Sequence, residues 1–194
     1  MSDLQILAIP GSLRAGSWNA ALLRLAQERA PEGVNIEIWE GLSTIPPFSE
    51  DHEILAPLPV EDLRQAIAES DALLVATPEY NGGPPGQLKN ALDWTSRPYG
   101  LAAVVGKPAG VISASTSSFG GRWAQDEIRK ALRLSGAAVI GEGLAVGKAA
   151  ERLAETGVAD DEILAGIDDV LERLVAKVAE VKLELELELE TADF

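Results

Sequence analysis

Short apolar runs alternate with helical patterns along the whole of this 194-residue chain, and that alternation restricts the possible folds more than any other feature. A short apolar run predicts a buried strand, and apolar residues recurring every three or four positions predict an amphipathic helix. A repeated strand–helix–strand order implies a parallel sheet with helices on both faces. The sequence therefore predicts an α/β domain of three layers.

A long loop is expected at residues 41–59, and long loops in compact domains are often functional. Ser17 is expected to cap the first helix. Strands are predicted over residues 4–9, 34–39, 72–76, 110–114 and 137–140, the last of which can continue to residue 146, and helices over residues 17–30, 60–70, 85–94, 119–134 and 160–181. Five strands in this alternation favour a parallel sheet in the flavodoxin-like order 2-1-3-4-5.

The end of the chain has a different pattern. Leucine and glutamate alternate strictly from Leu183 to Glu190. A helix would spread these leucines round its circumference, whereas a strand would place them all on one side. Two interpretations stay open for residues 182–194, a disordered acidic tail or an added edge strand that pairs with another subunit. The single domain is expected to span residues 1–181.

Composition excludes several kinds of chemistry. The chain has no cysteine and one histidine, His52, which argues against thiol nucleophiles, iron–sulfur clusters, cysteine-based zinc sites and histidine triads. A formal net charge of -15 disfavours nucleic acid and anionic membranes as partners. We find no apolar run of the roughly 20 residues that span a membrane and no signal segment, so a cytoplasmic location is expected.

A first polar loop, residues 11–19, follows the first strand and opens the first helix, with the sequence Gly-Ser-Leu-Arg-Ala-Gly-Ser-Trp-Asn. Backbone N–H groups, hydroxyls and a helix N-terminus together suit a phosphate. The loop lacks the Gly-Lys-Ser/Thr ending and the dinucleotide glycine spacing of two common nucleotide-binding loops, so it suits a monophosphate. Taken alone, an ordinary βα turn with a serine cap explains the segment equally well.

A second loop begins at Pro78 and leads into the helix at residues 85–94. Tyr80 can lie against a flat ring, and the backbone at Gly82 and Gly83 can approach the edge of a heterocycle. A third loop, residues 113–122, is rich in serine and glycine and could close over the same ring. The first two loops follow strands one and three, between which the strand order reverses, and ligands bind there in open parallel sheets.

The motifs Gly-Ser-Leu-Arg…Ser…Asn and Pro-Glu-Tyr-Asn…Pro-Gly…Leu-Lys-Asn…Asp-Trp resemble those of the NADPH-dependent FMN reductase family, over about residues 4–147. That family is flavodoxin-like, includes quinone, chromate and azo-dye reductases, and usually forms homodimers or homotetramers. The resemblance implies that the FMN phosphate is held by Ser12, Arg14, Ser17 and Asn19, the ring by Pro78, Glu79, Tyr80, Asn81 and Gly82, with further contacts from Ser115 and Gly120. Gly83 departs from the serine that is frequent there.

The leading functional hypothesis is an FMN-dependent oxidoreductase that passes a hydride from NADPH or NADH to FMN and then electrons to a small-molecule acceptor, by a ping-pong mechanism. No catalytic side chain is expected, because the flavin carries the chemistry. Arg122 or Arg97 is a candidate for holding the NADPH phosphates, although a surface ion pair explains either equally well. The alternatives are a flavodoxin-type electron carrier without NAD(P)H activity and a non-catalytic assembly protein.

Overall fold

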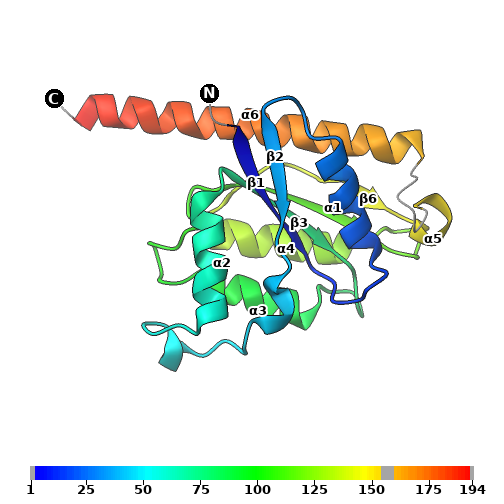
Figure 1. The fold of residues 1–194 in the computed structure, drawn as a ribbon, viewed down its shortest axis with the longest axis horizontal. Coiled ribbons are helices and arrows are strands. Elements are labelled where there is room, and N and C mark those ends of the chain that lie inside the picture. The colour runs from blue at the N-terminus through cyan, green and yellow to red at the C-terminus, as the bar shows by residue number, and fades with distance from the viewer. Residues whose placement is uncertain (1–2, 154–159, 193–194) are drawn as a thin grey trace.

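The structure, a computed structural model, describes residues 3–153 and 160–192. A parallel sheet forms its centre (Figure 1). The strands are β1 (Leu4–Pro10), β2 (Val34–Ile38), β3 (Ala72–Thr77), β4 (Pro108–Ala114), β5 (Ala138–Val139) and β6 (Ala145–Val146). Their order is β2-β1-β3-β4-β5, with β6 also paired to β4, and every pairing is parallel. The predicted strand order is confirmed.

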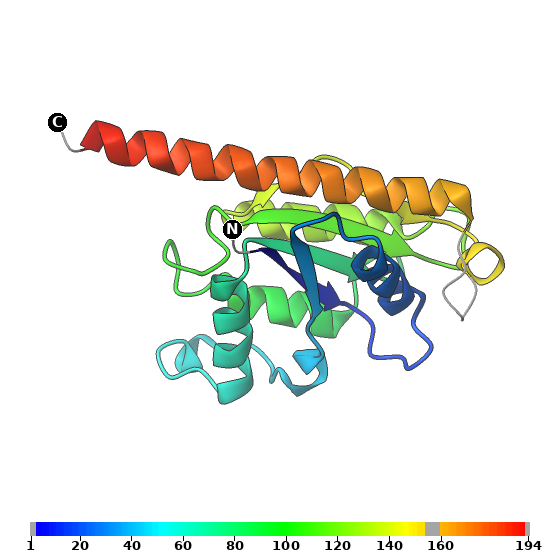
Figure 2. The same ribbon diagram turned by 45° about the horizontal axis from the view of Figure 1, so that its top comes forward.

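Helices cover both faces of this sheet (Figure 2). They are α1 (Trp18–Glu28), α2 (Leu58–Glu69), α3 (Gly86–Thr95), α4 (Arg122–Leu134), α5 (Ala149–Arg152) and α6 (Asp161–Ala192), with short 3₁₀ turns η1 (Gly41–Thr44) and η2 (Glu50–His52). Ser17 caps α1 as predicted, since its Oγ accepts a hydrogen bond from Ala20 N at 3.2 Å.

The core is divided between the two faces because successive side chains of a strand point in opposite directions. In β1, Ile6 and Ala8 pack with α1 and α6, while Leu7 and Ile9 pack with α2, α3 and α4. β3 is buried along its whole length. Two-sided burial explains why the strands read as continuous apolar runs rather than as alternating patterns.

The predicted fifth strand is two short strands. β5 pairs with Pro108 and Ala109, and β6 pairs with Ser113 and Ala114. The segment between them holds two more residues than the facing part of β4, so it bulges away from the ladder. Gly143 lies in the bulge, where a Cβ would overlap the carbonyl oxygen of Val111. The sheet consequently has six strands rather than the five predicted.

Both interpretations of the Leu/Glu segment were wrong about its structure, because α6 continues through it to Ala192. Leucine and glutamate both have high helix propensity, and the segment has neither the β-branched nor the aromatic residues typical of strands. The leucines do spread round the helix, and Leu183, Leu185, Leu187 and Leu189 are all exposed. Residues 193–194 lie outside the described residues.

The long loop before α2 is anchored to α3. The Gln87 side-chain amide donates to the carbonyls of Leu42 and Ile45, at 2.8 Å each, and the Asn90 amide donates to Pro46 O at 2.8 Å. Trp94 Nε1 donates to the same Pro46 oxygen, and its ring is fully buried. These hydrogen bonds show that α3, the helix that carries the end of the second motif, fixes the position of this loop.

Candidate functional site

Three polar loops meet at the carboxyl edge of the sheet, where they follow the neighbouring strands β1, β3 and β4. Between them lies a cleft of about 330 Å³. Its lining comes from all three loops: Ser12, Arg14, Ser17, Trp18 and Asn19 from the first, Pro78, Glu79 and Tyr80 from the second, and Ala114, Ser115 and Thr116 from the third. Eight of the eleven predicted site residues therefore line one cleft, and Asn81, Gly82 and Gly120 do not.

The first loop starts with a turn that only glycine permits. Gly11 N donates to Ala76 O at 2.7 Å, which ties the end of β1 to β3. A Cβ at Gly11 would lie 2.6 Å from Leu88 Cδ2 and 2.9 Å from Ala76 O. Because the backbone turns this tightly, the following hydroxyls and N–H groups face the cleft.

The N-terminus of α1 presents donors to the cleft. Ser17 is buried and uses its Oγ lone pair to cap Ala20, so its hydroxyl proton stays available for a ligand. The Ser12 Oγ accepts from Arg14 N at 3.4 Å in the same way. The first turn of α1 has no acidic residue, so the positive end of the helix dipole is not neutralised from within the helix.

Arg14 is the cation of this cleft. Its guanidinium folds back toward Gly16, where a Cβ would lie 3.2 Å from Nη1. No carboxylate of the described residues forms an ion pair with it, although the chain carries an excess of acidic residues. An arginine without a counter-ion beside a helix N-terminus suits a phosphate, which its planar group can bind with two hydrogen bonds.

Asn19 holds two loops together. Its Nδ2 donates to Ala114 O at 3.0 Å and its Oδ1 accepts from Ala114 N at 2.8 Å, and both residues are buried. The side-chain amide thus continues the hydrogen bonding of β4 at its carboxyl end. One N–H of the amide is left for a ligand, and the main effect of Asn19 is to fix the Ser115 loop against α1.

Glu79 caps a helix from a distance. Its Oε2 accepts from Trp123 N at 3.0 Å and from Ala124 N at 3.3 Å, two N–H groups in the first turn of α4. The N-cap residue of α4, Gly121, has no side chain that could do this. The second and third loops are therefore joined through one carboxylate.

Asn81 and Gly82 form the tip of a tight hairpin. Tyr80 N donates to Gly83 O at 2.8 Å and Gly83 N donates to Tyr80 O at 3.1 Å. Both tip residues have positive φ, 53° and 79°, as a type I′ turn requires. The tip lies outside the cleft lining, and the hairpin fixes the position of Tyr80 at its base.

The third loop contributes its first residues to the cleft. Ser115 Oγ bonds to the Ser117 hydroxyl and accepts from Ser117 N, each at 3.2 Å, which shapes the turn. Gly120, by contrast, is buried with φ 67°, and a Cβ there would lie within 2.9 Å of the backbone of β6 and Gly147. Gly120 therefore allows two backbone segments to pack rather than lining the cleft.

Three lining residues, Trp18, Ala114 and Thr116, were not predicted. Trp18 is the first residue of α1 and follows the predicted ligand Ser17, and this position in the sequence could have indicated that it lines the cleft. The aromatics that the sequence places near the loops divide into two groups. Trp94 is core, in edge contact with Phe48 at 4.9 Å, whereas Phe119 and Trp123 stack at 6.0 Å between ring centroids and are exposed.

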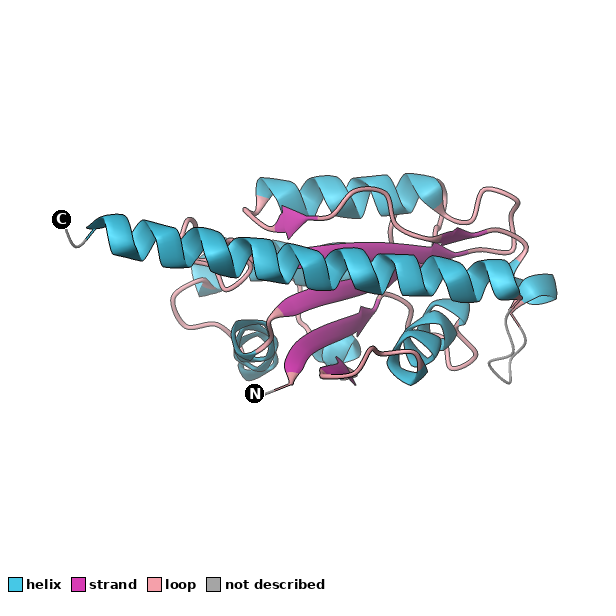
Figure 3. Cartoon of the chain, turned by 90° about the horizontal axis from the view of Figure 1, so that it is seen from above, coloured by secondary structure: helices cyan, strands magenta, loops and turns pink. Residues whose placement is uncertain are grey.

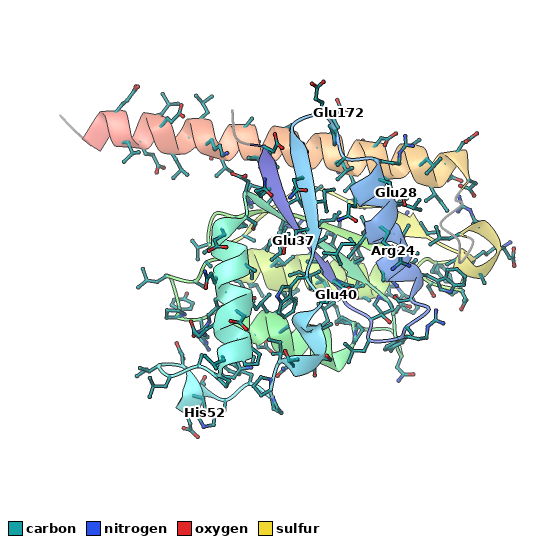
Figure 4. The ribbon with its side chains drawn as sticks, in the orientation of Figure 1. Arg24, Glu28, Glu37, Glu40, His52 and Glu172 are labelled. Atoms are coloured by element: carbon teal, nitrogen blue, oxygen red, sulfur yellow. The ribbon has the colours of Figure 1, made fainter. Side chains whose placement is uncertain are left out.

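The other charged candidates have partners. Arg97 pairs with Glu50 and Glu53 at the far end of α3, Lys89 pairs with Asp93 at 2.5 Å, and Arg122 pairs with Glu142 at 3.5 Å on the surface. His52 is exposed on η2 and does not line the cleft (Figure 4). Of the two candidates for the NADPH phosphates, only Arg122 belongs to a helix that starts at the cleft.

Residues 3–153 and 160–192 contain neither a candidate metal site nor a membrane-spanning helix. No group of three or more histidine, aspartate or glutamate side chains is placed to hold a metal ion. No helix in these ranges is long and apolar enough to cross a membrane.

Comparison with known proteins identifies the family of the chain. The NADPH-dependent FMN reductase family model matches residues 4–151. The chain is 46% identical over 131 residues to the NAD(P)H-dependent FMN reductase PA1204 of Pseudomonas aeruginosa, covering 67% of this chain and 70% of that protein. It is 38% identical over 126 residues to the 2-hydroxy-1,4-benzoquinone reductase of a Burkholderia species, covering 65% and 68%.

A solved structure shares the fold. The flavoenzyme FerB, an NAD(P)H:(acceptor) oxidoreductase from Paracoccus denitrificans, superposes with a TM-score of 0.79 at 31% identity, covering 90% of this chain and 98% of its own. The family match includes all three loops of the cleft and every strand of the sheet. The chain is an oxidoreductase of the NADPH-dependent FMN reductase family.

Proposed function

We propose that this chain binds FMN in the cleft and uses NAD(P)H to reduce quinones or similar small-molecule acceptors. The observation that carries the proposal is the meeting of three loops rich in donors at the N-terminus of α1, beside Arg14, which has no ion pair in the part of the chain that the structure describes. The relatives named as an FMN reductase and as a benzoquinone reductase support it.

The donor set near α1 fits a monophosphate. Ser12 and Ser17 each accept one hydrogen bond and keep a hydroxyl proton to donate, and Arg14 supplies a charge. The N–H groups of Trp18 and Asn19 belong to the first turn of α1, where N–H groups have no partner within the helix. In a chain of net charge -15, such local donors must overcome long-range repulsion of an anion.

The opposite part of the cleft fits a flat ring. Pro78 is buried and rigid, and Tyr80 is 53% exposed at the base of the hairpin, where its ring can lie against a ligand. Ser115 adds a hydroxyl from the third loop. In this proposal Asn81, Gly82 and Gly120 act by holding the loops in shape, as their turn and packing geometry suggests.

Held by these loops, FMN would supply the redox chemistry that links NAD(P)H oxidation to reduction of a quinone, chromate, azo or similar acceptor, in a ping-pong sequence. The chain's own contribution is binding and orientation. Glu79 is held by two backbone N–H groups and serves to position the loops. No lining side chain is a cysteine or histidine, so we assign no catalytic residue.

Two further parts of the proposal concern the nicotinamide cofactor and the cellular setting. Arg122 is exposed at the start of α4, and its surface pair with Glu142 can open to receive a phosphate of NADPH. We also propose a cytoplasmic homodimer or homotetramer, since members of this family usually assemble in that way.

The test is an absorption spectrum after adding FMN and desalting, followed by anaerobic NADPH. We expect a retained yellow band that NADPH bleaches. Arg14→Gln should weaken FMN binding about 10- to 100-fold, the effect of losing a hydrogen bond to a charged group. Arg24→Gln is the matched control, because Arg24 lies farther along α1 and outside the cleft lining (Figure 4).

Each of the other outcomes contradicts a stated part of the proposed function. A retained band that neither NADPH nor NADH bleaches indicates a flavodoxin-type electron carrier. Failure to retain FMN removes the site assignment as a whole. Equal FMN affinity in the Arg14 variant and the Arg24 control shows that Arg14 does not hold the phosphate.

A further inference from the structure

The last three turns of α6 project beyond the rest of the molecule (Figures 1 and 3). α6 packs its apolar stripe on the sheet as far as Val178, and residues 182–191 are all exposed. We call residues 182–192 the arm. α6 lies beyond residues 4–151, the part of the chain that matches the family model.

The arm combines apolar and acidic stripes. Leu183 and Leu187 lie on one side and Leu185 and Leu189 on nearly the opposite side, since two residues turn a helix by about 200°. These four leucines are 53–69% exposed. The glutamates between them, Glu184, Glu186, Glu188 and Glu190, form no ion pair within the described residues. A helix this exposed and this apolar is expected to contact another surface.

A complementary surface lies at the same end of the molecule, opposite the cleft. We call Tyr99, Leu101, Val105 and Leu134 the end patch; they are 48–84% exposed. Val105 lines one surface hollow with Tyr99 and Leu134 and a second with Leu185 of the arm, so the apolar surface is continuous. Apolar side chains of this size are seldom gathered on a surface without a function.

The cations of the end patch complement the arm. Lys107 and Arg133 have no ion pair among the described residues. The Lys107 ammonium donates to the carbonyls of Ser70 and Ala68, and burial lowers its pKa even though Asp71 acts in the other direction. The carboxylates nearby are Glu69 and Asp71, and Asp71 is paired with Lys182 at 2.8 Å. Among the described residues neither Lys107 nor Arg133 has a carboxylate within ion-pair distance, so each can receive one from a second molecule.

The arm cannot cover the end patch of its own chain beyond Leu185, because α6 runs straight and carries the remaining leucines away from the body (Figures 1 to 3). We propose that the arm of each molecule packs on the end patch of a second copy of this chain. Both surfaces lie at one end, so a two-fold axis places each arm over the other molecule's patch in an isologous contact. Leucines meet apolar side chains, and glutamates approach Lys107 and Arg133.

Cysteine cross-linking tests this contact directly, because the natural chain has no cysteine. Full-length Leu187→Cys and Leu101→Cys proteins are mixed in equal amounts, oxidised mildly, and analysed for linked peptides by mass spectrometry. We expect the mixed disulfide to exceed the products of the control mixture, Leu187→Cys with Arg24→Cys, by at least about tenfold. Arg24 is exposed on α1 and distant in sequence from both surfaces.

A second measurement uses the mass in solution by light scattering. Changing the four arm leucines to glutamine keeps helix propensity high and is expected to halve the mass of the assembly, with FMN retention as the check on folding. A wild-type monomer, an unchanged mass in this variant, or a Leu187→Cys protein that links to itself rather than to Leu101→Cys would each overturn the proposal.

Discussion

Replacing Asn19 with alanine removes both hydrogen bonds that fasten the end of β4 to α1. The bonds measure 3.0 Å and 2.8 Å, and the Ala114 N–H and carbonyl that they satisfy are buried. A buried backbone group left without its partner costs about 1–3 kcal/mol, so the two together predict a loss of roughly 2–6 kcal/mol in the free energy of unfolding. For a domain of this size that corresponds to a fall of about 4–24 °C in Tm.

The assay is urea unfolding followed by tryptophan fluorescence, without added FMN. We expect the midpoint to fall while the slope stays unchanged, which marks a change in stability alone. Asn35→Ala is the matched control: Asn35 donates to Gln5 Oε1 at 2.7 Å, but this hydrogen bond is exposed, so its effect should stay within about 0.5 kcal/mol. An Asn19→Ala protein as stable as this control would refute the reasoning.

Two other predictions concern stability. Gly143→Ala should destabilise the fold by about 3 kcal/mol or more, because the added Cβ would overlap Val111 O. Gly86→Ala should stabilise it by about 0.4–1 kcal/mol, because Gly86 is the first residue of α3 and has open space around it. Urea unfolding of both variants measures this contrast, and equal effects on stability would contradict the prediction. Burial raises the pKa of Asp71, but the Gln5 N–H and Lys182 lower it by more, so the net pKa lies below its usual value. A lowered pKa stabilises the folded state above the unfolded pKa of about 3.9, and this stability is lost as the pH falls through the folded pKa. Asp71→Asn should therefore reduce the urea midpoint at pH 7, with a difference from wild type that shrinks in acid; a difference independent of pH would contradict it.

Strand order and the meeting of the loops could be predicted because they depend on local patterns that agree with one another. Apolar runs gave the strands, their alternation with helices gave the parallel sheet, and the topology then placed the first two loops together. The Ser17 cap was also confirmed, since it follows from the sequence within one helical turn.

Other features depend on partners far along the chain, which no local pattern shows. Asn19 was predicted as a phosphate ligand, yet its amide is directed by Ala114, 95 residues away. The bulge between β5 and β6 follows from the close approach of Gly143 to Val111, and the helical arm follows from the propensities of leucine and glutamate, which outweigh their alternation.

The two helix N-termini that border the cleft differ in electrical character. That of α4 is already neutralised by the Glu79 carboxylate, while that of α1 is capped by the uncharged Ser17 hydroxyl and has no acid in its first turn. An elongated ligand with one anionic end is therefore favoured in a single direction, with its charge at α1 and its neutral end toward α4. By neutralising one of the two helix N-termini, the Glu79 carboxylate makes the two ends of the cleft electrostatically different. This difference decides which end of a ligand lies at which strand.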